Sequence, residues 1–507
     1  MTANLVSTGE WRAAPGAVTT FQVASPDLEA VTRDLANLRL ADMFGQDAGG
    51  GTVLRMVWAN DTPGQAGYVI TETPISGDEY PALSDITPAA FVEECEMYEQ
   101  FGIRPATGKP LNRIMLPPRG ALDAQLPTLG RGPESEPEEV RAPHTVGGQA
   151  FEFPFGPVRQ VGVESLYYGI VTSGEEVIDL YLFTWHKHRG LEWRLQGQTP
   201  EAAIFYAERA EGLSAVATGW ALAAAAEAVT GTRPPEPAQR TRAVALELER
   251  LYNHAAAMAA LCQSTGLTVG QSAAEIALER LLRLNARAFG HRYLFGVITP
   301  GGVTRAPQAD AIRAELPAAY GEFTRAASAL LATNSFMDRL EATGVLTAAQ
   351  AKELGMVGPV ARATGLTADS RGVPLGPYRE AASVNVATAT AGDCLARFTV
   401  MIAEAAESVR LIGEFLDAGT SAPTEAGMAA PLPPAAGAGL GWAESPRGEA
   451  LAWLALDDAG RITRARLRPG SVRNWRGFDD ACRSQNVFTD IPIIEASFWL
   501  TAAGMAR

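Results

Sequence analysis

A polar stretch from Asp123 to Gln149, rich in proline and glycine, is the feature that most limits how this 507-residue chain can fold. It contains Arg131-Gly-Pro-Glu-Ser-Glu-Pro-Glu-Glu139 and almost no large apolar residue. Because a segment of this composition cannot contribute to an apolar core, we expect a linker at 123–149. The chain should therefore contain two domains, at residues 1–122 and 150–507.

The first domain has the pattern of a small α/β fold. Gly51–Trp58 and Ala66–Glu72 are rich in β-branched and aromatic residues and are separated by turn residues, which predicts two strands. Asp27–Leu40 and Ala89–Gln100 are predicted to be helical.

The second domain begins with short strands and continues as helices. Gln160–Tyr168 and Glu176–Phe183 are strand candidates, and from Pro200 onward the apolar spacing is helical. A proline-rich stretch at Ala418–Gly441 predicts a long loop. We therefore predict an α+β protein, with a small α/β domain followed by a mainly helical bundle that has short β additions.

The charge balance limits the partners. The formal net charge is −15, and such an acidic chain would be repelled by nucleic-acid phosphates, so no nucleic acid is expected as a partner. Leu213–Val229 is the most apolar run, but it is rich in alanine and contains Glu227, which favours a buried helix over a membrane span. Met1–Trp11 lacks the features of a secretory signal, so we expect an intracellular chain.

Four cysteines are spread over the sequence without a Cys-x-x-Cys pair: Cys95, Cys262, Cys394 and Cys482. This spacing argues against a disulfide framework, a structural zinc site or an iron–sulfur cluster ligated by this chain alone. Cys95, Cys262 and Cys394 lie in apolar helical patterns, and we interpret them as small core residues.

A series of short strings after the linker is too specific for general packing. In order they are Phe155-Gly-Pro-Val158 with Glu164, His188-Arg-Gly-Leu-Glu192, Glu208-Arg209, Asn253-His254, Gly290-His-Arg292, Pro300-Gly-Gly-Val303, Gly358-Pro-Val-Ala-Arg362, Asp369-Ser-Arg371, Gly392-Asp-Cys-Leu-Ala-Arg397, Pro446-Arg-Gly-Glu449 and Arg466-Leu-Arg-Pro469. In this order they resemble the large subunit of group 4 membrane-bound nickel–iron hydrogenases and the related quinone-pocket subunit of respiratory complex I. The resemblance covers Phe151–Arg507.

The N-terminal part carries a second resemblance. Glu93–Ile103 and Pro110–Pro117 are similar to the small peripheral-arm subunit of complex I. Fusion of the two modules in one chain is typical of formate hydrogenlyase and hydrogenase-4 complexes.

The resemblance also locates the positions at which the hydrogenases hold their metals. These enzymes use two Cys-x-x-Cys pairs, and four soft thiolates are what nickel and iron require there. In this chain the first pair is replaced by Glu211 and Ser214, and the second by Thr501 and Gly504. We therefore predict no bound metal and no hydrogenase chemistry, with Glu211 bonded to Arg209 or to another basic group.

The resemblance implies further site residues. Glu164 matches a proton-relay glutamate of the hydrogenases, and with Glu211 it is our catalytic candidate; its structural alternative is an ion pair with Arg159, His188 or Arg189. Residues predicted to support the pocket or an interface are Arg159, His188, Arg189, Glu192 and Arg209. The usual quinone-headgroup donors are replaced, by Arg159 or Val163 and by Gly212, and Tyr167, Tyr168 and His144 are candidate substitutes.

Other motif residues are predicted to be structural. His254 follows the helical period and is interpreted as a hydrogen-bonded core histidine. Arg362, Asp369 and Arg371 are expected to form an ion-pair network, and Gly301 and Gly302 a tight turn.

The resemblance implies a subunit of a complex I-like, energy-converting-hydrogenase-related oxidoreductase complex at the cytoplasmic face of the membrane. The implied partners are an iron–sulfur subunit and membrane-embedded antiporter-like and anchor subunits. No cofactor is expected on this chain itself; an iron–sulfur cluster would be held by the partner, and a quinone is a candidate substrate. The alternative is a catalytically silent scaffold of the same kind of complex.

Overall fold

The computed structural model describes residues 17–62, 66–117, 128–130, 132–133, 150–159, 164–373, 378, 384–420, 425–483 and 485–507. The chain forms two compact units. Unit 1 comprises Met1–Arg194, Ala349–Met356 and Thr501–Arg507, and unit 2 comprises Leu195–Ala348 and Val357–Leu500. Most of the predicted linker, together with His144 and Val163, lies outside the described residues, so the predicted boundaries at residues 122 and 150 stay predictions.

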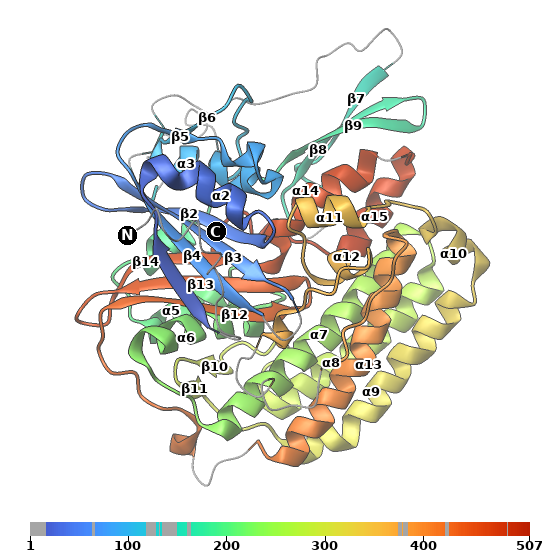
Figure 1. The fold of residues 1–507 in the computed structure, drawn as a ribbon. Coiled ribbons are helices and arrows are strands. Elements are labelled where there is room, and N and C mark those ends of the chain that lie inside the picture. Colours follow the sequence, from blue (N-terminus) through green and yellow to red (C-terminus); the bar gives the residue numbers. More distant parts are fainter. Residues whose placement is uncertain are drawn as a thin grey trace. The chain divides into compact units, whose positions relative to one another are not determined.

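Unit 1 combines a four-stranded sheet, a three-stranded sheet and short helices (Figure 1). Its elements are β1 (Val18–Gln22), η2 (Ser25–Asp27), α2 (Leu28–Leu35), β2 (Arg39–Asp47), β3 (Thr52–Asn60), β4 (Gly67–Ile75), β5 (Glu79–Pro81), η3 (Leu83–Asp85), η4 (Pro88–Ala90), α3 (Phe91–Phe101), β6 (Arg104–Ala106), β7 (Ala150–Phe155), β8 (Tyr167–Ser173) and β9 (Glu176–Phe183). Helices α4 (Leu191–Leu195) and α11 (Ala348–Glu353) lie at its boundaries in the sequence.

The larger sheet of unit 1 has the strand order β1-β4-β3-β2, in which β1 pairs in parallel with β4 and the other pairs are antiparallel. Leu35 of α2 packs with Leu54 and Trp58 of β3 in one apolar cluster that also contains Met97 and Phe101 of α3. The sheet and the two helices therefore share one core, as expected when each element has one apolar face.

Unit 2 is mainly helical. Its elements are α5 (Pro200–Ala207), α6 (Ala215–Thr230), α7 (Glu236–Ser264), α8 (Thr268–Phe289), β10 (Ile298–Thr299), β11 (Gly302–Val303), α9 (Ala309–Leu331), α10 (Asn334–Leu340), α12 (Gly358–Arg362), η6 (Ser370–Gly372), α13 (Cys394–Ala418), η8 (Glu425–Met428), β12 (Gly437–Ser445), β13 (Gly448–Leu456), β14 (Ile462–Arg468), α14 (Gly470–Arg483), η9 (Phe488–Asp490) and α15 (Ile491–Phe498). Within it, α7 packs against α8 and α13, and α8 packs against α9 (Figure 1).

A three-stranded antiparallel sheet, β12-β13-β14, packs against α6. Alanine-rich α6 presents little side-chain bulk, and it is buried from Ala215 to Glu227. On the strand side, a methyl group at Gly441 would lie 2.1 Å from the backbone oxygen of Ala221, and one at Gly439 would lie 2.4 Å from that of Ala225. Only glycine permits this approach of strand and helix backbones.

Several sequence predictions can be compared with these elements. The α+β class is confirmed. Strand β9 and helix α3 agree with prediction, whereas the first predicted helix ends at Leu35 because β2 begins at Arg39. The predicted strand at Gln160–Tyr168 begins only at Tyr167 in the part that is described.

Two further predictions concern unit 2. The predicted loop at Ala418–Gly441 ends early because β12 begins at Gly437. The helix expected at Leu213–Val229 is α6. In the described residues, no helix has the length and apolar character that a membrane crossing requires.

Candidate functional site

The turn between α5 and α6 holds three of the predicted site residues, Arg209, Glu211 and Ser214. Ser214 is the residue before α6, and its backbone N–H donates a 2.7 Å hydrogen bond to the carbonyl of Glu211. Two N–H groups in the first turn of α6, on Val216 and Ala217, donate to the carboxyl of Glu249 from α7, at 2.7 and 3.1 Å. Glu249 therefore fixes the N-terminus of α6, and with it the turn, against α7.

Glu211 and Ser214 are fully buried and are bound by groups from distant parts of the chain. The Ser471 hydroxyl donates to Glu211 Oε1, and Arg447 donates a 3.0 Å hydrogen bond to Ser214 Oγ. Nε of Arg447 lies 3.7 Å from Glu211 Oε1 and donates to the carbonyl of Trp499. Arg447 is thus a basic group beside Glu211.

This group of side chains can carry protons but has no soft ligand. It offers one carboxyl, two hydroxyls and one guanidinium, and a guanidinium is a donor only. In the part of the chain that the structure describes, no three His, Cys, Asp or Glu side chains come together in a way that could hold a metal ion. The oxygen donors here do not fit a nickel–iron centre, which needs thiolates.

The remaining predicted residues near the C-terminus lie in unit 1, where two side chains meet at Ala503. Glu164 accepts a hydrogen bond from the N–H of Ala503, and Arg189 donates a 2.6 Å hydrogen bond to its carbonyl. The N–H of Arg189 also donates to the carbonyl of Ala506 at 2.9 Å. Glu164 and Arg189 together therefore hold the segment that contains Thr501 and Gly504.

A second contact in unit 1 involves Arg507. Its guanidinium forms ion pairs with Glu192 at 3.0 Å and with Glu96 at 2.6 Å, and all three side chains are buried. His188, Glu192 and Arg507 line a cavity of about 10 Å³, which is room for about one water molecule. His188 and Glu192 thus line the same small cavity, and the role predicted for them and for Arg189 stays a prediction.

Two predicted arginines have local contacts. Arg159 lies over the ring of Tyr168, with Cζ 4.9 Å from the ring centroid. Arg209 is exposed, donates to the carbonyl of Phe205 and lies 3.7 Å from Glu208. Of the two alternatives raised above for Glu211, the contact with another basic group is present, since Nε of Arg447 lies 3.7 Å from its carboxyl. The roles of these residues stay predictions.

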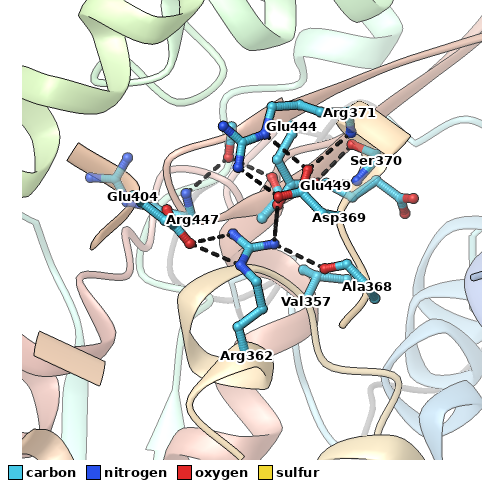
Figure 2. A network of polar contacts seen from close by, with 12 residues as sticks. Val357, Arg362, Ala368, Asp369, Ser370, Arg371, Glu404, Glu444, Arg447 and Glu449 are labelled. Carbon is cyan, nitrogen blue, oxygen red and sulfur yellow. Dashed lines mark hydrogen bonds and ion pairs between the residues drawn. The ribbon is translucent and has the colours of Figure 1, made fainter. Parts of the chain in front are cut away.

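The ion-pair network expected around Arg362 is present (Figure 2). Arg362 contacts Asp369 at 3.4 Å, Glu404 at 2.8 Å and Glu444 at 2.9 Å. Arg371 binds Asp369 at 2.6 Å. The network is larger than predicted, since Glu404 and Glu444 were not singled out from the sequence.

His254 is hydrogen-bonded in the core, as predicted. Its Nε2 lies 3.0 Å from Glu404 Oε2, and the imidazole is buried. Gly301 lies in the turn between β10 and β11, as predicted, whereas Gly302 is the first residue of β11 and pairs with Thr299.

Sequence reasoning missed Glu249, Ser471 and the position of Arg447. Arg447 belongs to Pro446-Arg-Gly-Glu449, one of the strings that carried the resemblance. The sequence therefore marks Arg447 as notable, but it does not indicate the contact with Ser214 and Glu211. Glu249 and Ser471 carry no motif of their own and meet α6 and Glu211 only through tertiary packing.

Two buried carboxyls of unit 2, Glu208 and Glu249, have pKa values raised into the neutral range. Burial raises the pKa of Glu208 to about 7, although the N–H of Gly296 donates to it. Burial also raises the pKa of Glu249 to about 8, against the opposing effect of two backbone hydrogen bonds. Both groups can exchange a proton near neutral pH.

Comparison with known proteins agrees with the resemblance seen in the sequence. Residues 272–436 match the family described as respiratory-chain NADH dehydrogenase, 49 kDa subunit. Formate hydrogenlyase subunit 5 of Escherichia coli is 26% identical over 85% of this chain and 77% of its own length. An NADH-quinone oxidoreductase subunit of Roseiflexus sp. is 29% identical over 69% of this chain and 96% of its own length.

One further relative is the carbon monoxide-induced hydrogenase of Rhodospirillum rubrum, which is 28% identical over 68% of this chain and 96% of its own length. Among solved structures, a chain from the membrane-bound sulfane sulfur reductase, an archaeal respiratory membrane complex, matches with a TM-score of 0.66 and 22% identity, over 72% of this chain and all of that one. The predicted resemblance to hydrogenase large subunits and complex I subunits is therefore confirmed.

Proposed function

We propose that this chain is a subunit of a complex I-like, hydrogenase-related membrane oxidoreductase complex, and that it has no nickel–iron hydrogenase activity of its own. Relatives named as subunits of formate hydrogenlyase and NADH-quinone oxidoreductase support the kind of complex. In this proposal the chain lies at the cytoplasmic face and is held there by an iron–sulfur subunit and by membrane-embedded subunits. Electrons from the partner's cluster reduce a substrate beside it, for which a quinone is the candidate.

The hydrogen bond between Arg447 and Ser214 is the observation on which the absence of hydrogenase activity rests. The resemblance assigns Ser214 and Glu211 to thiolate positions of the hydrogenases. Here the Ser214 hydroxyl accepts from Arg447, and the Glu211 carboxyl accepts from Ser471. Protein donors thus already bind both groups, and neither offers a sulfur to a soft metal.

Proton supply is the role proposed for Glu164 and Glu211. A buried or half-buried carboxyl can act as an acid or a base when neighbouring groups form hydrogen bonds with both its protonated and its ionised form, because the free-energy cost of changing its charge is then moderate. Glu164 is positioned by the N–H of Ala503, and Glu211 by Ser471.

The first experiment identifies the assembly. The tagged chain is purified from its native membranes in a mild detergent, and the proteins that accompany it are identified by mass spectrometry. Recovery with an iron–sulfur subunit and antiporter-like membrane proteins is expected. Recovery of the chain alone from the soluble fraction would contradict the proposal.

The second experiment tests the chemistry on the purified complex. We expect no hydrogen-dependent reduction of a viologen dye and no stoichiometric nickel, but reduction of a quinone analogue by a low-potential donor. Hydrogen-dependent dye reduction, together with nickel bound to this chain, would overturn the proposed lack of hydrogenase activity.

A matched pair of variants tests Glu164. Glu164→Gln keeps an oxygen that can accept from Ala503 but cannot ionise, whereas Glu164→Ala loses both properties. We expect both variants to assemble and both to lose turnover. If Glu164→Gln keeps full turnover while Glu164→Ala fails, the residue only positions the C-terminal segment and the relay role is wrong.

A catalytically silent scaffold is the alternative, and one observation favours it. Glu211, Ser214, Arg447 and Ser471 bind one another, which a structural role alone would explain. Glu211→Gln retains an acceptor for Ser471 and should therefore assemble. Full activity of an assembled Glu211→Gln complex would favour the scaffold at this position, and lost activity would favour proton handling.

A further inference from the structure

The centre of unit 2 contains charged side chains that are almost completely shielded from water. They come from α7, α12, the η6 segment, α13 and β12, and we call them the central cluster: Glu247, Arg250, His254, Arg362, Asp369, Arg371, Glu404 and Glu444. Each of their side chains is at most a few per cent exposed. Figure 2 shows Arg362 between Glu404 and Glu444.

The charges of the central cluster do not balance if every carboxyl is ionised. Three guanidinium groups face four carboxyl groups, so a neutral His254 leaves one negative charge in excess. An uncompensated charge at such a depth is costly, and a buried group usually binds a proton instead. One additional proton, on a carboxyl or on His254, would make the cluster neutral.

Three of the four carboxyls are strongly bound by cations. Glu404 is held by Arg362 at 2.8 Å, with Arg250 3.8 Å away, and Asp369 is held by Arg371 at 2.6 Å. Glu247 is 3.1 Å from Arg250 and 3.3 Å from Arg371. It also accepts 2.6 Å hydrogen bonds from the hydroxyls of Tyr378 and Ser408.

Glu444 has the weakest compensation. Its ion pair is with one nitrogen of Arg362, which also lies 3.4 Å from Asp369. Its other oxygen accepts from the N–H and the hydroxyl of Ser370, at 3.0 and 2.8 Å, and both donors are neutral. Arg250 reaches the backbone carbonyl of Glu444 rather than its carboxyl.

His254 is the other group that could hold the proton. Burial lowers its pKa, and Arg250 and Arg362 act in the same direction, although Glu404 opposes them. In contrast, burial raises the pKa of Glu444 and the charge of Asp369 raises it further, although Arg362 and Arg250 act in the opposite direction. Outside the cluster, Arg250 and Arg447 act on Glu249, and Arg447 lies 3.7 Å from Glu211. Glu449, the residue opposite Glu444 on β13, is held by Arg468 at 2.5 Å.

We propose that Glu444 is a buried proton-binding site, which takes up one proton from water and releases it to water while the Ser370 hydroxyl remains hydrogen-bonded to it. This goes beyond the proposed function, because proton binding is a property of this chain by itself and requires neither the complex nor a substrate. The proton compensates the excess charge of the central cluster.

Infrared difference spectroscopy on the purified full-length chain tests the proposal near neutral pH. The spectrum of the wild type minus that of Glu444→Gln should contain one C=O band of a protonated carboxyl, which the variant lacks. Loss of a carboxylate band instead would show that Glu444 is ionised and would overturn the proposal.

A second variant keeps the test decisive if Glu444→Gln does not fold. Ser370→Ala removes one hydrogen bond to the carboxyl and leaves all charges in place, so the protonated C=O band should move to higher frequency. A change confined to the carboxylate region would contradict the proposal.

Nitrogen-15 NMR of His254 gives an independent result, since a neutral imidazole is expected and an imidazolium would place the proton there.

Proton linkage provides a third readout. A carboxyl whose pKa is raised in the folded state binds more protons there than in the unfolded chain, so its stabilising effect is lost as the pH rises above the unfolded value of about 4.3. The unfolding equilibrium constant of the wild type should therefore rise with pH about tenfold per unit more steeply than that of Glu444→Gln. Equal slopes would overturn the proposal.

Discussion

Arg447 donates a 3.0 Å hydrogen bond to the hydroxyl of Ser214, and both side chains are buried in unit 2. The same guanidinium lies 3.7 Å from the carboxyl of Glu211 and binds the carbonyl of Trp499. A fixed positive charge thus lies within the group of oxygen donors that occupies the thiolate positions implied by the resemblance. We therefore expect removal of this charge to lower the stability of unit 2, whether or not the protein's activity depends on it.

The first prediction concerns this charge. Arg447→Met should lower the free energy of unfolding by about 3–5 kcal/mol, because it removes a cation from beside the buried carboxyl of Glu211. Arg447→Lys is the matched control, since it keeps the charge but loses the fork of donors, and it should cost less. Urea unfolding followed by circular dichroism measures both, and a Met variant as stable as the wild type would contradict this interpretation of the contact.

The location of this group shows what sequence can and cannot provide. Ser214 and Glu211 could be identified because they lie in one short string beside a helix start, and such local patterns are readable. Arg447 and Ser471 reach them from more than two hundred residues away, and no local pattern encodes that pairing. The central cluster is similar, because Arg362, Asp369 and Arg371 lie close in sequence while Glu404 and Glu444 come from α13 and β12.

The second prediction tests the close packing of β12 on α6. Gly441→Ala should destabilise the protein by about 1–3 kcal/mol or more, because the added methyl group would overlap the backbone of Ala221 and neither backbone can move freely. Around Gly413 in α13, no described atom beyond the neighbouring residues and the backbone of the same helix lies within 4 Å of the position that its methyl group would take. Gly413→Ala should therefore stabilise the protein by up to about 1 kcal/mol, as helix propensity alone would give. Thermal unfolding compares the two, and similar effects of the two substitutions would contradict this packing argument.

The sheet that makes this contact was not predicted. The run Leu451-Ala-Trp-Leu-Ala-Leu456, the turn residues Asp457–Gly460 and the alternation of Ile462-Thr-Arg-Ala-Arg-Leu-Arg468 form a hairpin signal. Helical periodicity is the stronger pattern in the rest of that half of the chain. In α7 and α8 the same periodicity predicted the elements correctly, because a long apolar face is the strongest local signal.

The third prediction is a pH dependence at Glu208, whose pKa is raised by burial to about 7. The folded state then holds a proton that the unfolded chain releases above about pH 4.3, so stability falls as the pH rises from there to about 7. Within that window the contribution of Glu208 makes the unfolding equilibrium constant rise about tenfold per pH unit, and Glu208→Gln should remove this contribution.

Arg209→Gln provides a control at the same position in the fold, because it should change the pH dependence of stability in the opposite direction to Glu208→Gln. The Arg209 charge lowers the pKa of Glu208, so its removal should extend the sloping window to higher pH. Urea unfolding at several pH values measures all three proteins. An unchanged slope in Glu208→Gln would mean that this carboxyl is ionised in the folded state throughout the range.

The fourth prediction concerns the C-terminal segment of unit 1, which is held through Arg507. Arg507→Leu leaves the buried carboxyls of Glu96 and Glu192 without their shared cation, and breaking a buried pair typically costs about 3–5 kcal/mol. The penalty can be relieved locally if Thr501–Arg507 detaches, so we expect faster amide hydrogen exchange in that segment, including the N–H of Ala503 that Glu164 binds.

The matched control for this variant is Arg507→Lys, which retains one positive charge but cannot reach both carboxyls with a planar fork, and its exchange should be intermediate. Glu192→Gln combined with Arg507→Leu should recover part of the lost protection, because one of the two carboxyls that lose Arg507 is then absent. Hydrogen-exchange mass spectrometry on the full chain resolves the segment. Wild-type protection in Arg507→Leu would show that Glu164 and Arg189 hold Ala503 without help from the buried ion pairs.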